Sequence, residues 1–211
     1  MKLTPSLLPE MIEAIEQIIE ENSEEVTALD QEIGDGDHVY NLQRGIEALK
    51  TKQDELVGLS WPEAWKKMGM IVMSTIGGAS GALYGSFLVS MSKAAKDKDV
   101  DAKVFADAFM QGVESVKKHG RADVGEKTML DVWVPVAEYL QKAAQEGQDL
   151  KELLIELNRV AEQGMEATRD MVATRGRASF LGERSVGHID AGAKTAQLMI
   201  KAITGVIEKH L

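Results

Sequence analysis

The chain has 211 residues, of which 44% are hydrophobic and 27% are charged, and its 34 acidic residues exceed its 24 Lys and Arg residues to give a net charge of -10. This composition excludes a disordered chain and is typical of one folded globular domain, which we expect to span residues 1–211. The negative charge disfavours nucleic acid and anionic lipid as partners, and the absence of Cys excludes disulfides and thiolate metal sites. The charged N-terminus and the lack of an apolar run of about 18 residues predict a cytoplasmic protein that does not cross a membrane.

Helical periodicity runs through most of the chain and strand alternation is nearly absent, which predicts an all-α fold. We expect long amphipathic helices at about residues 5–22, 38–55, 61–76, 79–96, 101–119, 126–146, 149–170 and 190–209, and a short helical piece at 23–29. Ser60 with Glu63, and Asp149 with Glu152, have the spacing of helix N-terminal caps. Because the connections are mostly short, sequential helices are expected to be antiparallel, in an up-and-down bundle or a closed ring.

Three stretches interrupt the helical pattern, at residues 30–39, 76–85 and 174–192. Long ordered loops in a compact domain are usually functional. The chemistry of this protein is therefore expected in these three stretches.

The first stretch lies within the sequence LDQEIGDGDHVYN and carries Asp30, Asp35 and Asp37. Their carboxylates can converge, and converging carboxylates are stabilised by a cation such as Mg²⁺ or Ca²⁺. An EF-hand is excluded because Tyr40 stands where the loop requires Gly and Ile46 stands where it requires Glu. The alternative is a solvated acidic turn that caps a helix.

The second stretch, IGGASGALYG, contains Gly77, Gly78, Gly81 and Gly85. A helix that starts here with Ser80 as its N-cap would offer free backbone N–H groups to a phosphate. The alternative is close helix packing through small residues. No Walker sequence is present, and VGEKT lacks the required Gly before its Lys.

The third stretch places Arg175, Arg177 and Arg184 among glycines. Guanidinium groups match phosphate oxygens, although these arginines could instead pair with the surplus acidic residues. Carboxylates for Mg²⁺, a helix N-terminus for phosphate and arginines for a transferring group together favour phosphoryl transfer without a Walker-type fold.

Four motifs, LDQEIGDGDH, IGGASGALYGS, GEKTMLDVW and GRASFLGERSVGHIDAGA, resemble those of the nucleotide-binding subunit (DhaL) of bacterial dihydroxyacetone kinases, in the same order and over nearly the full length. The resemblance implies a closed up-and-down barrel of eight amphipathic helices that binds ADP or ATP at one end through two Mg²⁺ ions. It implies that Asp30, Asp35 and Asp37 are the Mg²⁺ ligands. The nucleotide-binding residues that it implies are His38, Asn41, Ala79, Ser80, Gly120, Met129, Arg177, Asp190 and Gly192.

The same resemblance implies a division of labour between chains. Dihydroxyacetone would be held by a separate substrate-binding subunit, this chain would supply the phosphoryl donor, and a phosphohistidine protein would recharge ADP to ATP. Arg177 would stabilise charge on the transferring group. Val39, Ala82 and Ala191 depart from the family pattern of Gly, Pro and Pro, and the β-branched Val39 predicts a reshaped loop over the nucleotide.

Three other functions are consistent with the sequence to different degrees. The chain could be a kinase subunit of this family for another small sugar or ketose. It could also be a nucleotide-loaded binding protein that docks on a transcription regulator without turnover, which is a second duty known in the family. A helical barrel for an apolar ligand fits less well, since it leaves the acidic loop unexplained.

Overall fold

The computed structural model describes residues 3–211, and these residues form nine α-helices and four 3-10 helices with no β-strand. The α-helices are α1 (Leu8–Glu21), α2 (Ser23–Ile33), α3 (His38–Thr51), α4 (Trp61–Thr75), α5 (Gly78–Ala94), α6 (Ala102–Gly120), α7 (Leu130–Glu146), α8 (Leu150–Ala167) and α9 (Ala191–Lys209). The 3-10 helices are η1 (Pro5–Leu7), η2 (Gln53–Glu55), η3 (Thr168–Asp170) and η4 (Arg177–Ser185). The all-α prediction is therefore confirmed for the described residues.

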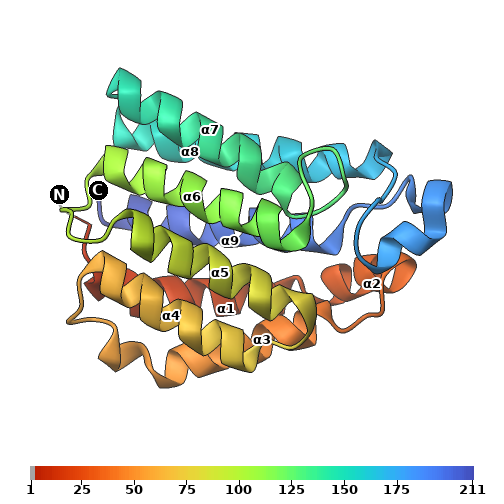
Figure 1. Ribbon diagram of the computed structural model, residues 1–211, viewed down its shortest axis with the longest axis horizontal. Helices are drawn as coiled ribbons and strands as arrows, with labels where there is room; N and C mark the ends of the chain where they lie inside the picture. The colour runs from red at the N-terminus through yellow and green to blue at the C-terminus, as the bar shows by residue number, and fades with distance from the viewer. Residues whose placement is uncertain (1–2) are drawn as a thin grey trace.

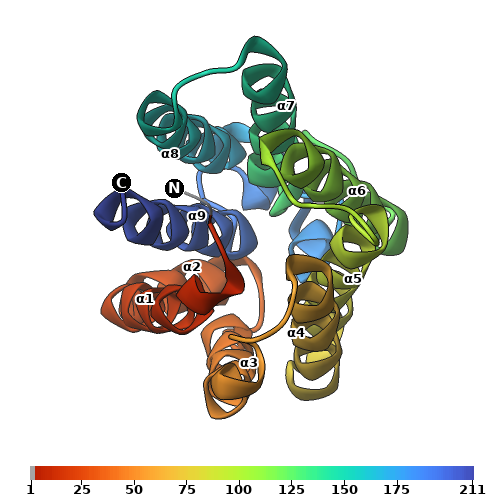
Figure 2. The ribbon, with the colours of Figure 1, turned by 90° about the vertical axis from the view of Figure 1, so that its left-hand side faces the viewer.

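Eight helices, α1 and α3 to α9, form a ring in which each packs against the next and α9 packs against α1 (Figure 2). Consecutive helices of the ring run in opposite directions along the long axis of the molecule (Figure 1). This is the closed up-and-down barrel that the resemblance implies. The ninth helix, α2, lies at one end of the barrel, which we call the α2 end (Figure 1).

The inner faces of the helices form one continuous hydrophobic core. Trp133 of α7 is buried in this core, and its ring centroid lies 5.4 Å from that of Tyr84 and 4.6 Å from that of Phe87, both in α5. Phe87 also meets Phe109 of α6 edge-on at 5.1 Å. Aromatic residues bury large apolar areas, and this cluster joins three consecutive helices of the ring.

The helix boundaries follow the local capping signals at several positions. The Ser60 amide donates to the Glu63 carboxylate at 3.0 Å at the start of α4, and the Asp149 carboxylate accepts from the Lys151 amide at 2.9 Å at the start of α8. Both expected caps are therefore present.

Within the described residues, no helix is both long enough and apolar enough to cross a lipid bilayer.

Several expected boundaries differ from the structure, including the end of α3 at Thr51 where residue 55 was expected. Helix α5 begins at Gly78 with Gly77 as its N-cap, so the expected N-cap, Ser80, lies inside the first turn instead. Gly78 has a φ of +66°, which a residue without a Cβ adopts at little cost. The helix expected from residue 126 begins at Leu130, because residues 121–129 form a loop. Helix α2 extends to Ile33, beyond the expected end at residue 29. The third interrupted stretch contains the 3-10 helix η4.

The connections are divided between the two ends of the barrel. Residues 22–37, 76–77, 121–129 and 168–190 lie at the α2 end, whereas residues 52–60, 95–101 and 147–149 lie at the opposite end with both chain termini (Figure 1). All three stretches that interrupt the helical pattern are therefore at the α2 end.

Candidate nucleotide and metal site

A cavity of about 630 Å³ opens at the α2 end of the barrel. All the site residues that the sequence predicted contribute to its wall, although they come from five different segments of the chain. These residues are Asp30, Asp35, Asp37, His38, Asn41, Ala79, Ser80, Gly120, Met129, Arg177, Asp190 and Gly192. Its volume lies within the range of about 300–1,000 Å³ that is typical of small-molecule sites.

The three aspartates form a compact carboxylate cluster. Asp30 comes from the last turn of α2, while Asp35 and Asp37 come from the loop that follows, and one oxygen of each lies within 4.8 Å of the others. The Asp30 carboxylate also accepts a hydrogen bond of 3.1 Å from the amide of His38. Carboxylate oxygens at this spacing suit hard divalent cations such as Mg²⁺ and Ca²⁺.

Two glycines allow the chain to bend around this cluster. A Cβ at Gly34 would lie 2.2 Å from an Asp30 carboxylate oxygen, so a larger residue would displace Asp30. Gly36 has a φ of +76°. Val39 follows in the first turn of α3, is buried at 6% exposure and has an ordinary helical backbone, so its side chain packs in the core.

The α2 end is rich in helix N-termini. The first residues of four helices line the cavity, namely His38 of α3, Gly78 of α5, Leu130 of α7 and Ala191 of α9. A helix N-terminus carries unpaired N–H groups and a partial charge of roughly +0.5, which favours anions. The alternating direction of the barrel helices therefore brings four positive dipole ends to one cavity in an acidic protein.

The arginines connect the third stretch to acidic residues at the cavity rim. The Nε atom of Arg177 lies 2.7 Å from an oxygen of Asp35, and an Nη atom of Arg175 lies 3.1 Å from Glu126. The pairing of arginines with acids is thus present in the structure. Arg177 remains largely exposed, and its Nη groups can donate to a bound anion beside the carboxylate cluster.

A set of hydrogen-bonded groups lies at the base of the cavity. The Nε2 atom of His38 is 2.9 Å from the hydroxyl of Thr195, which donates to the carbonyl of Gly192 at 3.1 Å. Burial lowers the pKa of His38, and the nearby Asp30 and other aspartates oppose this shift.

Asp190 caps the N-terminus of α9 by accepting a hydrogen bond of 2.8 Å from the amide of Ala193. Burial raises its pKa to about 7, although the same hydrogen bond and the nearby Lys127 favour the charged form. Near neutral pH, Asp190 can therefore gain or lose a proton in response to a ligand in the cavity.

Two charged residues of this region were not among the predicted site residues. Lys127 lines the cavity and is 1% exposed, and Asp131 is 2% exposed. The sequence around Lys127, VGEKT, is not a Walker phosphate-binding motif, and it gives no other indication that Lys127 is buried at the cavity. The position of Asp131 within the apolar stretch LDVWV is a sequence signal of a buried polar contact, because Asp is rarely buried without a partner.

Known proteins resemble this chain in both sequence and fold. The model of the DAK2 domain matches residues 32–205. The ADP-binding subunit DhaL of PEP-dependent dihydroxyacetone kinase 1 from Listeria innocua is 40% identical over 185 residues, which are 88% of each chain. The ADP-binding subunit DhaL of the PEP-dependent dihydroxyacetone kinase from Escherichia coli is 36% identical over 187 residues, or 88% of this chain and 89% of that one.

The fold is also found in a longer kinase chain. The crystal structure of the dihydroxyacetone kinase from C. freundii in complex with AMP-PNP and Mg2+ superposes with a TM-score of 0.70 at 19% identity, covering 94% of this chain and 33% of that chain. This similarity shows the shared fold, and the present chain corresponds to about a third of the longer one. The domain match over most of the chain, together with relatives of 36% and 40% identity, shows that this protein belongs to the DAK2 domain family, among relatives named DhaL.

Proposed function

We propose that this chain is the nucleotide-carrying subunit of a dihydroxyacetone kinase, which binds ADP or ATP with Mg²⁺ at the α2 end. The observation that carries the proposal is the coincidence of the three-aspartate cluster with four helix N-termini at one cavity. This combination suits a metal-bound polyphosphate, because the carboxylates attract the cations and the helix ends attract the phosphates. The names of the two DhaL relatives, which include ADP binding, support it.

Asp30, Asp35 and Asp37 would hold the metal, with two ions as the proposed number. When bound, Mg²⁺ would supply positive charge that offsets the negative charge developing during transfer. The backbone N–H groups of Ala79 and Ser80, in the first turn of α5, would donate hydrogen bonds to phosphate oxygens.

Arg177 is the proposed catalytic residue. Its guanidinium is held against Asp35 at the cavity rim and is therefore already close to where a terminal phosphate beside the metal cluster would lie. A cation at that position stabilises the negative charge spread over a transferring phosphoryl group. The remaining proposed contacts to the nucleotide come from His38, Asn41, Gly120, Met129, Asp190 and Gly192.

The acceptor and the recharging donor are proposed to reside on other proteins. The PEP-dependent names of the relatives support a phosphohistidine donor subunit and a separate subunit that binds dihydroxyacetone. Docking on a transcription regulator stays a further proposal. A cytoplasmic location is proposed for the whole complex.

The first test is the substitution Asp35→Asn, which removes one carboxylate and the partner of Arg177. We expect Mg-ADP affinity to fall by more than about 100-fold, since even residues that only support a metal ligand typically contribute 10–100-fold. Isothermal titration calorimetry measures the affinity, and native mass spectrometry shows whether ADP and two Mg²⁺ ions stay bound to the wild-type chain.

The control is Asp107→Asn, which makes the same chemical change at an exposed carboxylate of α6 that pairs with Lys103 at 3.2 Å. This variant should bind Mg-ADP like the wild type. Unchanged affinity in Asp35→Asn would show that the aspartate cluster does not hold the metal.

A further inference from the structure

The segment between α8 and α9 is a loop whose two ends are held together. The amide of Gly187 donates to the carbonyl of Arg169 at 2.7 Å, and the amide of Asp190 donates to the hydroxyl of Thr168 at 3.1 Å. We call residues 170–186, which include Arg175 and Arg177, the arginine loop. Because its two ends are hydrogen-bonded to each other, this segment resembles an Ω-loop, although it contains η4.

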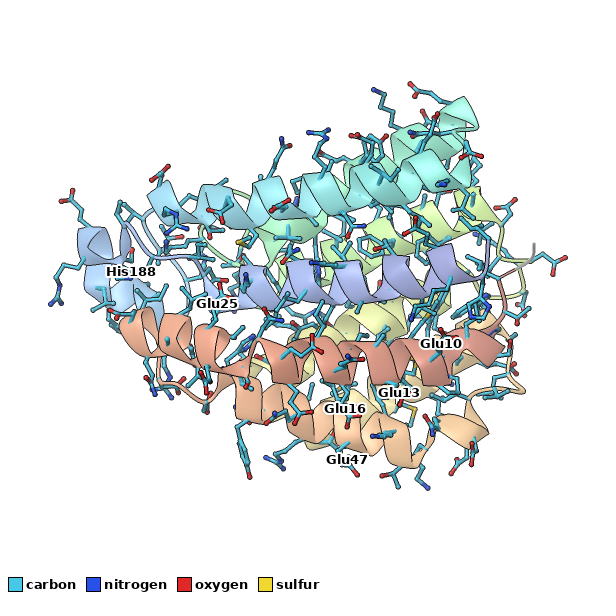
Figure 3. The ribbon with its side chains drawn as sticks, turned by 180° about the vertical axis from the view of Figure 1, so that it is seen from behind. Glu10, Glu13, Glu16, Glu25, Glu47 and His188 are labelled. Atoms are coloured by element: carbon cyan, nitrogen blue, oxygen red, sulfur yellow. The ribbon has the colours of Figure 1, made fainter. Side chains whose placement is uncertain are left out.

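A lysine from a different loop lies inside this stem. The Nζ atom of Lys127 donates to the carbonyl of Thr168 at 2.5 Å and also to the carbonyl of His188. Thr168 follows the end of α8, and His188 lies at the α2 end shortly before α9 begins (Figure 3). One buried side chain therefore hydrogen-bonds both sides of the stem of the arginine loop.

The backbone around Lys127 is held in an unusual conformation. Lys127 has a φ of +62°, a left-handed conformation that disfavours residues with a Cβ. The Asp131 carboxylate fixes this conformation by accepting hydrogen bonds of 2.5 Å from the Gly125 amide and 2.7 Å from the Thr128 amide. Strained backbone persists where surrounding contacts over-determine it, and it is concentrated at functional sites.

The charges around Lys127 favour an ammonium group inside the protein. Its acceptor at Thr168 lies at the C-terminal end of α8, where the helix dipole is negative. Burial lowers the pKa of Lys127, and the carboxylates of Asp190 and Asp131 oppose that shift. Asp190 is also one of the proposed nucleotide contacts, and both Lys127 and Asp190 line the cavity.

We propose that Lys127 is a positioning residue for phosphoryl transfer, which holds the stem of the arginine loop so that Arg177 stays beside the aspartate cluster. The effect on phosphoryl transfer rests on the function proposed above. The cross-link itself follows from the contacts of Lys127 with Thr168 and His188. Lys127 touches neither Arg177 nor the aspartate cluster in any described hydrogen bond, so it acts through the loop.

The decisive variant is Lys127→Met, which keeps an unbranched side chain only one atom shorter and removes both hydrogen bonds. Hydrogen exchange monitored by mass spectrometry should show about tenfold faster exchange in the arginine loop, because hydrogen bonds from a charged group are the strong ones. The amides of Ala173 and Gly187 are the reporters, since Ala173 donates to the Ser185 hydroxyl within the loop and Gly187 donates to the Arg169 carbonyl in its stem. Exchange in α1 and α4 should not change.

The catalytic arm measures phosphoryl transfer to dihydroxyacetone by the complex assembled with its partner subunits. We expect Lys127→Met to lower kcat by about 100-fold, the loss that a misplacement of about 1 Å can cause. When Arg177→Gln is already present, adding Lys127→Met should lower kcat by less than about threefold further. The reason is that Lys127 acts by positioning Arg177, and the guanidinium is then absent. A residue that only stabilised the fold would give the same loss in both backgrounds.

Two further variants keep the test decisive. Thr168→Val removes the hydroxyl that the Asp190 amide binds but leaves the carbonyl that Lys127 binds, and it should speed exchange in the same loop. Lys50→Met removes a lysine from a surface pair with Glu16 at 2.6 Å and should change neither exchange nor kcat.

The outcomes separate this inference from the proposed function. Unchanged exchange in the arginine loop of Lys127→Met, or additive losses of kcat with Arg177→Gln, would overturn the role of Lys127. If Lys127→Met does not fold, Lys127→Gln, which has a shorter and uncharged side chain, takes its place, and unchanged loop exchange in that variant overturns the role of Lys127. Absence of phosphoryl transfer by the wild-type complex would reject the proposed function, while the exchange experiment would still decide the cross-link.

Discussion

Asp190 illustrates how burial at the cavity changes the chemistry of a single residue. Its carboxylate caps α9, yet its surroundings raise its pKa from 3.8 to about 7. The folded state therefore binds this proton more tightly than the unfolded chain does. The contribution of Asp190 to stability is fully present below pH 3.8 and is lost as the pH rises through about 7.

Asp190→Asn should remove this pH dependence, because Asn is an equally good N-cap and carries no titrating proton. Relative to the wild type, the variant is expected to gain stability progressively between pH 4 and pH 7 and then to stay level. Urea unfolding followed by circular dichroism across this range measures the difference. Two parallel stability curves would show that Asp190 takes up no proton on folding.

At the scale of helices, the glycines of α5 have two separate roles. Gly77 and Gly78 shape the N-terminus at the cavity, whereas Gly81 allows α5 to pass close to Ile76 in the turn after α4, and Gly85 allows α5 to approach α4 closely. A Cβ at Gly81 would lie 2.2 Å from the carbonyl oxygen of Ile76, and one at Gly85 would lie 2.9 Å from Met73. The two interpretations of this stretch, phosphate binding at a helix N-terminus and close packing through small residues, therefore apply to different glycines.

Gly81→Ala should consequently destabilise the protein by about 1–3 kcal/mol, the usual cost of overpacking. The matched control is Gly205→Ala in α9, where an added Cβ meets nothing within 4 Å. That substitution should stabilise the protein by roughly 0.5–1 kcal/mol, because Ala favours the helix. Chemical denaturation measures both, and a stabilising effect at Gly81 would show that a Cβ at this position does not crowd the Ile76 carbonyl.

The sequence predicted those parts of the structure that depend on residues close together in the chain. Helical periodicity located the barrel helices, and the spacing of Asp30, Asp35 and Asp37 located the acidic cluster. The acceptors of Lys127 lie 41 and 61 residues away, and no periodicity encodes such contacts. The four helix N-termini likewise meet only because the ring closes, and the individual nucleotide contacts came from the resemblance.

At the scale of the whole molecule, an acidic chain concentrates its anion-attracting groups at one end. The net charge is -10, yet four helix N-termini, Arg175 and Arg177 lie around one cavity. Elsewhere the surface carries much of the acidic excess, as the labelled Glu10, Glu13 and Glu16 of α1 illustrate on the opposite view (Figure 3). Local positive ends rather than total charge therefore decide where an anion binds.

The three aspartates of the cluster would repel the phosphates of ADP unless a cation lies between them. ADP should therefore stabilise the protein only together with Mg²⁺. At a concentration 100 times its Kd, Mg-ADP is expected to add about 2.7 kcal/mol to the free energy of unfolding. Differential scanning calorimetry with Mg-ADP, with ADP plus EDTA and with Mg²⁺ alone measures this effect. Equal stabilisation by ADP in EDTA would argue that nucleotide binding does not use the metal.

Both termini of the barrel lie at the end opposite the cavity (Figure 1). A fluorescent protein, an affinity tag or a flexible tether joined to either terminus would emerge away from the cavity mouth. Immobilisation on a sensor surface through the C-terminus should therefore leave the mouth open to nucleotide and to partner proteins. The same geometry lets a barrel of this kind be built into a much longer polypeptide without blocking its opening.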